Sequence, residues 1–247
     1  MNQNIELTSR QTQLLKVIID EYIETAEPVG SVSIEKKYDI GVSPATIRND
    51  MADLTTKGYL KQPHTSAGRI PTSLAIKFYI NQLMEEKKLS LTDEVQAKEN
   101  VWDARNNLDQ LLKDATQALA EKTHQLAVTT LSDGSKYIYG HSMIFDYPEF
   151  TNFEVSRSIF SILEHNRRFN ELFFEHLTGA TPIEILFGEE LGWEFFEPVG
   201  VVASRFQIGN KQGAIGVLGP IRLNYASVIP LVRYFGRLIE EIGNENV

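Results

Sequence analysis

The segment from Pro28 to Thr72 constrains the fold more than any other part of this 247-residue sequence. It contains a short helical pattern, a turn at Gly41, a second helical pattern opened by Ser43-Pro44, and a polar loop between two short apolar runs. Serine is favoured just before a helix, and proline at its first position. This order is typical of a winged helix-turn-helix, whose second helix enters the DNA major groove. The first hypothesis is therefore sequence-specific DNA binding.

Three helices and a two-stranded wing are expected in this region. Apolar residues at helical spacing predict helices over 8–26, 31–38 and 43–58. The apolar runs at 59–60 and 69–70 should form the wing strands. The expected N-caps of the three helices are Thr8 (in a capping box with Gln11), Ser31 and Ser43.

The residues that would read DNA follow from which side of the third helix is buried. Ile47, Met51 and Leu54 recur at i, i+4 and i+7, so this side should face the core. Thr46, Asn49 and Asp50 should then point outward, with Ala45 and Arg48 beside them. Arg can bind guanine and Asn adenine through paired hydrogen bonds. The candidate DNA-binding residues are Ser31, Ser43, Ala45, Thr46, Arg48, Asn49, Lys57, Lys61, His64, Thr65, Ser66 and Arg69.

The charge distribution gives modest support to this hypothesis. The net charge of −9 argues against a nucleic-acid binder, but residues 1–80 are neutral overall and residues 81–247 carry the whole excess. Between residues 48 and 77, five basic side chains accompany two acidic ones. Exposed charges more than about 10 Å away are screened at about 0.1 M salt, so a local basic surface can still attract phosphates. A solvated surface, or a hairpin that contacts protein, remains an alternative for the same residues.

The rest of the chain predicts an α+β domain. We expect residues 1–88 to form the DNA-binding domain and residues 89–247 a long helix plus an antiparallel sheet with helices on one side. Strands are expected at 183–187, 199–206 and 214–218, and a hairpin turn at 132–134. Expected helices include one opened by a capping box at Thr151 and Glu154 and a final one over 225–242. Pro230 in that last helix must lie in the first turn or cost a backbone hydrogen bond.

A long amphipathic helix is expected from Leu91 to about Leu126, a segment that contains no Gly or Pro. Its apolar stripe could hold two chains together, because the helix directly follows the DNA-binding domain. The alternative is that the stripe packs on its own sheet and that aromatic residues of the second domain, Trp193, Phe195 and Phe196, form the dimer. The candidate dimerisation residues of the stripe are Val101, Leu108, Leu111, Leu112, Ala115 and Leu119.

Several function classes have little support. The sequence contains no apolar run of about 18 residues that could span a membrane. The absence of cysteine excludes disulfides and thiolate chemistry, and is compatible with a cytoplasmic protein. The histidines have no zinc spacing, and Glu189-Glu190 lies in an expected turn, where solvated carboxylates are the default. We therefore expect no enzyme activity, no metal and no cofactor.

Some sequence motifs resemble a known family. The segments VGS, SPATIRNDMADL and GYLKQPHTSAGRIPT are similar to the winged-helix domain of the HrcA family of heat-inducible repressors. Tyr147–Phe150, YPEF, and Gly219–Tyr225, GPIRLNY, resemble two further motifs of that family. The resemblance implies a homodimer that represses chaperone and chaperonin genes by binding an inverted-repeat operator. It also implies a GAF-like second domain and regulation by the chaperonin GroEL.

The chain departs from this family in length. Family members usually carry an inserted dimerising domain before the YPEF-like motif, where this chain has only about residues 129–141. The sequence is therefore interpreted as a short variant that needs another dimer surface. A second hypothesis keeps the winged helix but makes the GAF-like domain a sensor of a small molecule, because such folds often hold ligands in an apolar cavity.

Overall fold

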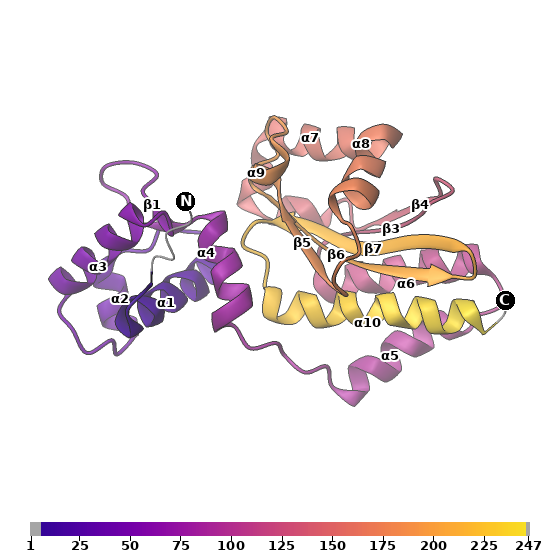
Figure 1. The fold of residues 1–247 in the computed structure, drawn as a ribbon, viewed down its shortest axis with the longest axis horizontal. Coiled ribbons are helices and arrows are strands. Elements are labelled where there is room, and N and C mark those ends of the chain that lie inside the picture. Colours follow the sequence, from indigo (N-terminus) through magenta and orange to yellow (C-terminus); the bar gives the residue numbers. More distant parts are fainter. Residues whose placement is uncertain (1–5, 246–247) are drawn as a thin grey trace. The chain divides into compact units, whose positions relative to one another are not determined.

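The computed structural model describes residues 6–245, apart from the side chain of Asn100. The chain divides into two compact units, residues 1–85 and 86–247. The boundary therefore lies three residues before the one expected from the sequence. Figure 1 shows the elements of each unit, which are described separately below.

The first unit has the element order expected of a winged helix-turn-helix: three helices, then a short antiparallel hairpin. A helix and a π-helical turn follow the hairpin and lead to the end of the unit. The elements are α1 (Ser9–Thr25), α2 (Ser31–Lys37), α3 (Pro44–Thr56), β1 (Leu60–Lys61), β2 (Ile70–Pro71), α4 (Ser73–Phe78) and η1 (Tyr79–Leu83).

Two of the three expected helix starts are confirmed. Thr8 forms the capping box with Gln11, and the Ser43 hydroxyl accepts a hydrogen bond from the Thr46 amide at 3.3 Å. The expectation for Ser31 is wrong, because Gly30 is the N-cap of α2 and Ser31 is already its first residue. Since glycine has no side chain to accept a bond, this helix starts without a side-chain cap.

The wing is tied to the segment before α2 by a short backbone bridge. Val29 and Arg69 exchange two backbone hydrogen bonds, each of 2.9 Å. Gly68 lies so close to this bridge that a Cβ atom there would clash with the backbone carbonyl of Val29. The glycine is therefore required by the close approach of two backbone segments.

The second unit is α+β, with a five-stranded antiparallel sheet in the order β4-β3-β7-β6-β5. Its strands are β3 (Leu126–Leu131), β4 (Lys136–Tyr139), β5 (Glu184–Phe187), β6 (Val199–Ile208) and β7 (Lys211–Pro220). Its α-helices are α5 (Leu91–Trp102), α6 (Leu108–Thr123), α7 (Phe153–Glu164), α8 (Asn166–Asn170), α9 (Gly188–Leu191) and α10 (Tyr225–Asn244). Its 3-10 and π turns are η2 (Met143–Asp146), η3 (Pro148–Thr151) and η4 (Glu171–His176).

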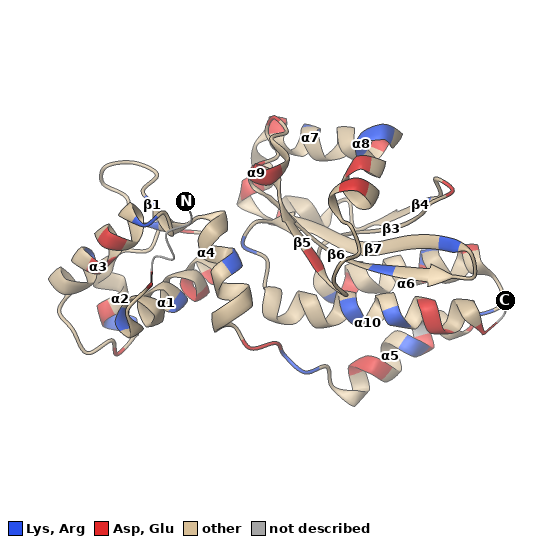
Figure 2. Ribbon diagram, in the orientation of Figure 1, with Lys and Arg blue, Asp and Glu red and all other residues tan. Residues whose placement is uncertain are grey.

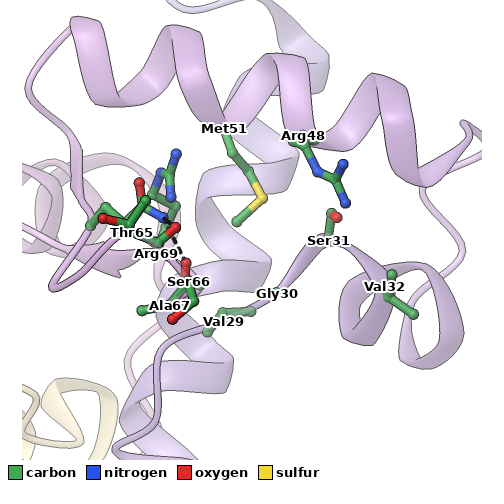
Figure 3. Close-up of a pocket in the computed structure, with 12 residues that line it drawn as sticks. Val29, Gly30, Ser31, Val32, Arg48, Met51, Thr65, Ser66, Ala67 and Arg69 are labelled. Atoms are coloured by element: carbon green, nitrogen blue, oxygen red, sulfur yellow. Dashed lines mark hydrogen bonds between the residues drawn. The ribbon is translucent and has the colours of Figure 1, made fainter.

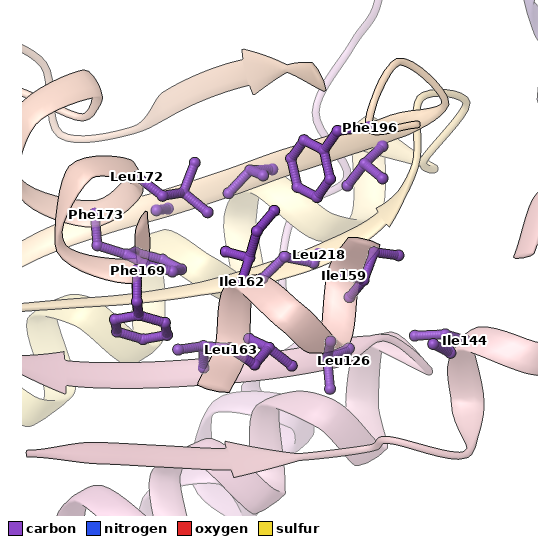
Figure 4. Close-up of a cluster of buried hydrophobic side chains, with 14 of the residues drawn as sticks. Leu126, Ile144, Ile159, Ile162, Leu163, Phe169, Leu172, Phe173, Phe196 and Leu218 are labelled. Atoms are coloured by element: carbon purple, nitrogen blue, oxygen red, sulfur yellow. The ribbon is translucent and has the colours of Figure 1, made fainter. Parts of the chain in front are cut away.

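The expectation that helices cover only one side of this sheet is wrong. In Figure 1, α6 and α10 lie along one face, whereas α7 and α8 lie on the other. Each residue of β3 is buried, and β6 and β7 are buried over most of their length. Strands without polar alternation need cover on both faces. Figure 4 shows the aromatic and aliphatic side chains of α7, α8 and η4 that fill the second interface.

The expected long helix is also wrong, because residues 103–107 separate α5 from α6. Asn107 caps α6 by accepting a hydrogen bond from the Gln110 amide at 3.2 Å. Asparagine and aspartate compete with helical hydrogen bonds through their own side chains, and this segment contains Asp103, Asn106 and Asn107. The absence of glycine and proline therefore did not guarantee a continuous helix.

The apolar stripe that we considered for dimerisation is part of the core. Val101, Leu111, Leu112, Ala115 and Leu119 are fully buried within the single chain, and Leu108 is half-buried. Helix α6 packs against β3, β4 and α10. The stripe is therefore not available to a second chain.

The expected capping box of α7 is wrong as well, because Asn152 caps this helix by accepting a hydrogen bond from the Glu154 amide.

Pro230 lies in the second turn of α10, so its ring nitrogen cannot donate to the carbonyl of Ala226. The amide of Lys87 donates to this carbonyl instead, at 2.8 Å. Next to it, Arg233 donates two hydrogen bonds to the Glu86 carboxylate, at 2.6 and 2.8 Å. The proline thus leaves a backbone acceptor free, and the segment that enters the second unit binds there.

We expect Glu86→Gln to lower the free energy of urea unfolding by up to about 1 kcal/mol at pH 7. The hydrogen bond from Arg233 lowers the pKa of Glu86 below that of a free glutamate, about 4.3. The ion pair therefore stabilises the fold above that pH, and the effect is lost as the pH falls through the lower pKa. The neighbouring Glu85→Gln serves as control, and an equal loss in both variants would contradict this role.

A second prediction concerns the wing glycine. Gly68→Ala should destabilise the protein by about 1–3 kcal/mol, because the new methyl group meets backbone that cannot rotate away. Gly30→Ala is the matched control, since its Cβ would meet nothing nearer than the Ser33 hydroxyl, at 3.8 Å. Urea unfolding of both variants tests the difference, and equal stabilities would show that the bridge does not require glycine.

Candidate nucleic-acid interface

The outward side of α3 carries the side chains expected to read bases. Ile47 and Leu54 are fully buried, which fixes the rotation of the helix about its axis. Ala45, Arg48 and Asn49 are exposed as a result. Together they offer a guanidinium, an amide and a methyl group on one surface, which suits the edges of bases in the major groove.

Asp50 does not face outward, contrary to expectation. Its residue is only 5% exposed, and its carboxylate accepts two hydrogen bonds from Arg10 of α1, at 2.6 and 3.1 Å. The apolar spacing placed Asp50 at the border of the buried side, and a partner 40 residues away decided its position. Asp50 therefore joins α3 to α1 and does not belong to the candidate interface.

The first turn of α3 is already engaged in capping. The Ser43 and Thr46 hydroxyls lie 3.1 Å apart, and Ser43 also accepts from the Thr46 amide. Ser43 is exposed and Thr46 is half-buried. These two residues hold the helix start in place, while Arg48 and Asn49 are the outward residues with longer polar side chains.

The wing tip is exposed and internally ordered. His64, Thr65 and Ser66 are exposed, and the His64 ring lies 3.2 Å from the Ser66 hydroxyl. The Gln62 side-chain amide donates to the carbonyls of Thr65 and Ala67, at 2.9 Å each. Gln62 is not among the candidate residues expected from the sequence, where its place beside the polar loop is the one signal for it. The amide holds the loop in one conformation and leaves its side chains outside.

A hollow of about 410 Å³ lies between the start of α2, the outer side of α3 and the wing. Figure 3 shows Arg48 and Met51 projecting into it from α3, opposite Ser31 and the wing residues Thr65 and Ser66. Ser31 is only 8% exposed and lines this hollow without projecting from the surface. The hollow brings together candidate residues from three separate elements.

Two of the candidate cations have internal partners. The Lys57 ammonium donates to the Gln11 side chain at 2.9 Å and to the Glu6 carbonyl at 3.3 Å. The Arg69 Nε donates to the Thr55 hydroxyl at 3.1 Å, which joins the wing to α3. Both residues are half-buried, whereas Lys61 on the wing is exposed. Arg48 and Lys61 are therefore the candidate cations most open to a ligand.

Figure 2 shows that basic and acidic residues are interspersed along α1 to α3. Several of these charges form pairs, such as Lys16 with Asp20 at 2.7 Å and Lys37 with Glu21 at 2.7 Å. Long-range attraction by the whole unit is consequently weak, because nine basic and ten acidic side chains give residues 1–85 a net charge of −1. Binding at this surface would depend on local contacts.

The described residues were searched for metal-ligand clusters and for membrane-spanning helices. No three histidine or acidic side chains in this part of the chain gather closely enough to hold a metal ion. Among residues 6–245 we also find no helix whose length and apolar character suffice for a membrane span.

Comparison with known proteins identifies the family. The family model described as the HrcA protein C terminal domain matches residues 69–229. The heat-inducible transcription repressor HrcA of Carboxydothermus hydrogenoformans is 30% identical over an alignment of 342 residues, which covers 97% of this chain and 99% of the relative. The protein of the same description from Acetivibrio thermocellus is 44% identical over 128 residues, covering 51% of this chain and 36% of the relative.

The alignment with the Carboxydothermus protein is longer than the 247-residue chain, so that relative contains residues that this chain lacks. A crystal structure of a hypothetical protein has the same fold, with a TM-score of 0.82 and 20% identity over 98% of this chain and 100% of that one. The family match and the full-length relative agree with the motif resemblance at both ends of the chain. This chain belongs to the HrcA family.

Proposed function

We propose that the chain is a transcriptional repressor that binds double-stranded operator DNA through α3 and the wing. The observation that carries the proposal is the exposure of Arg48 and Asn49 on the outward side of α3, next to an ordered polar wing. Both side chains can form paired hydrogen bonds with purines in the major groove. Relatives that match nearly the whole chain are described as heat-inducible transcription repressors.

The wing supplies contacts to the DNA backbone. His64, Thr65 and Ser66 offer small hydrogen-bond donors, and Lys61 offers a positive charge at the base of the hairpin. Contacts to phosphate orient a protein on the duplex, whereas contacts to base edges select the sequence. In this arrangement α3 determines the operator sequence, and the wing adds affinity and fixes the angle of approach.

The repressor acts on stress genes as a homodimer. An inverted-repeat operator requires two copies of α3 related by a two-fold axis. The name of the relatives supports heat-inducible targets, and the family resemblance adds the chaperonin GroEL as a regulator. Genome-wide mapping of bound sites tests this: a shared inverted repeat upstream of chaperone operons is expected, and scattered sites without one would contradict it.

The second unit supports a structural role better than small-molecule sensing. Between its sheet and the α7–α8 layer, fully buried aromatic residues occupy the space that a ligand would need; they are Phe169, Phe173 and Phe196. A filled interior of this kind favours a domain that joins chains or receives a protein signal over one that binds a metabolite.

Arg48→Ala and Asn49→Ala should each weaken operator binding by about 1–3 kcal/mol. Neither change should have much effect on binding to random DNA. Lys61→Ala should weaken binding to both DNAs alike. It should also make the negative slope of log K against log salt shallower by about one. Titrations at several salt concentrations measure both effects. Identical behaviour of the Arg48 and Lys61 variants on the two DNAs would contradict the assigned roles.

Lys57→Ala provides a matched control for Lys61→Ala. The two lysines are four residues apart, but the Lys57 ammonium is bonded to Gln11 and the Glu6 carbonyl. We expect the Lys57 variant to be less stable in urea unfolding. The slope of log K for DNA binding against log salt should stay that of the wild type. A lower slope with unchanged stability would place Lys57 among the phosphate contacts.

His64→Ala should change the free energy of unfolding by no more than about 0.5 kcal/mol, because the side chain is exposed and its ring contacts the exposed Ser66 hydroxyl. Its affinity for operator DNA should fall. Thermal unfolding and DNA titration of the same preparation separate the two effects. A large drop in melting temperature with unchanged affinity would make the loop a structural element.

A further inference from the structure

The outer side of α7 carries a stripe of large and charged residues. Phe153, Arg157, Phe160 and Glu164 follow one another at intervals of four, three and four, so they share one side of the helix. They line a hollow of about 550 Å³ together with Phe145 of η2. We call these five residues the α7 surface.

The α7 surface is unusually apolar for an exposed region. Phe153 is 72% exposed and Phe145 is 54% exposed. The half-buried Phe160 ring lies 6.2 Å from the Phe145 ring, so the aromatic residues form one patch. Contiguous exposed apolar patches with a polar rim mark interaction sites. Of the aromatic residues expected from the sequence to fill this role, Phe196 is fully buried and packs against Trp193, and Phe195 is 39% exposed, less than Phe145 or Phe153.

The charges of the α7 surface are self-complementary. Arg157 and Glu164 are both exposed and lie two helical turns apart, with Phe160 between them. If two copies of α7 pack antiparallel about a two-fold axis near Phe160, Arg157 lies opposite Glu164 of the partner subunit. The same axis creates the pair a second time, as an isologous interface requires. A foreign partner would not require opposite charges at matched distances from the centre of one helix.

We propose that the α7 surface is the homodimer interface of this chain, with the Phe160 rings near the axis and two Arg157–Glu164 pairs at the sides. The inference rests on the proposed function, because the inverted-repeat operator is what requires a dimer. It is also consistent with the burial of the apolar stripe of α5 and α6 inside the single chain, which keeps those side chains from contacting a second chain.

Charge reversal tests the pairing by sedimentation of the purified full chain without DNA. Arg157→Glu and Glu164→Arg, each alone, should raise the dimer dissociation constant about tenfold or more, because like charges then face each other. A mixture of the two variants should dimerise like the wild type, since both pairs again have opposite charges. Lys113→Glu, an exposed change of the same size on α6, is the control and should leave the dimer unchanged.

Any one of three results overturns the proposal. The wild type could be a monomer, neither charge reversal could weaken the dimer, or the mixture of the two variants could fail to dimerise. Both side chains are exposed, and the 3.4 Å contact of Arg157 with Glu154 is a surface ion pair that contributes little, so the variants should keep the circular dichroism and melting temperature of the wild type. Binding to a single operator half-site separates this inference from the proposed function. A monomeric variant that binds the half-site like the wild type supports both, whereas a chain that dimerises through α7 but binds no operator contradicts only the repressor function.

Discussion

The rotation of α3 about its own axis is the constraint on which the candidate site depends. Burial of Ile47 and Leu54 sets this rotation, and the ion pair between Asp50 and Arg10 fixes it from the side of α1. Turning an α-helix by one residue changes the direction of each side chain by about 100°. Such a turn would bury Arg48 or expose Leu54. The candidate DNA-binding surface therefore consists of the residues of α3 that the core leaves exposed.

A second buried interaction explains why two distant motifs occur together in the second unit. Arg222 donates to both oxygens of Glu149, at 2.6 and 3.1 Å, and both side chains are at most 15% exposed. The Arg222 guanidinium also lies 5.7 Å from the centre of the Tyr147 ring. Removing one member would leave a buried charge without its partner, which is strongly destabilising. The YPEF and GPIRLNY segments therefore stabilise the fold together. This contact is sufficient to explain why both motifs are present, without a ligand bound between them.

How far the sequence could predict the structure depends on the range of the interaction that decides each feature. Local signals were sufficient for the caps at Thr8 and Ser43 and for the inward side of α3, because these involve neighbours within four residues. They were not sufficient for Asp50, whose partner Arg10 lies in another helix. They also failed for the second covered face of the sheet, since that depends on where α7 and α8 pack in three dimensions.

Pro230 illustrates how a local rule can point to a tertiary contact. Its place beyond the first turn of α10 leaves the Ala226 carbonyl without its helical donor, as the sequence rule states. The rule does not say what replaces the donor. In the structure the amide of Lys87, more than a hundred residues earlier, takes that place. An apparent defect in one helix thereby fixes the chain where it enters the second unit.

The α7 surface and the shortness of the chain have a common physical consequence. The motif resemblance places the inserted domain of longer family members where this chain has about residues 129–141, a few residues before Phe145. A chain that lacks this insertion has fewer residues with which to cover the Phe145 and Phe160 rings. Exposed aromatic surface is costly in water, at roughly 25 cal/mol for each Å². Pairing two copies of α7 removes that cost for both chains at once, so loss of the insertion and dimerisation through α7 are compatible changes.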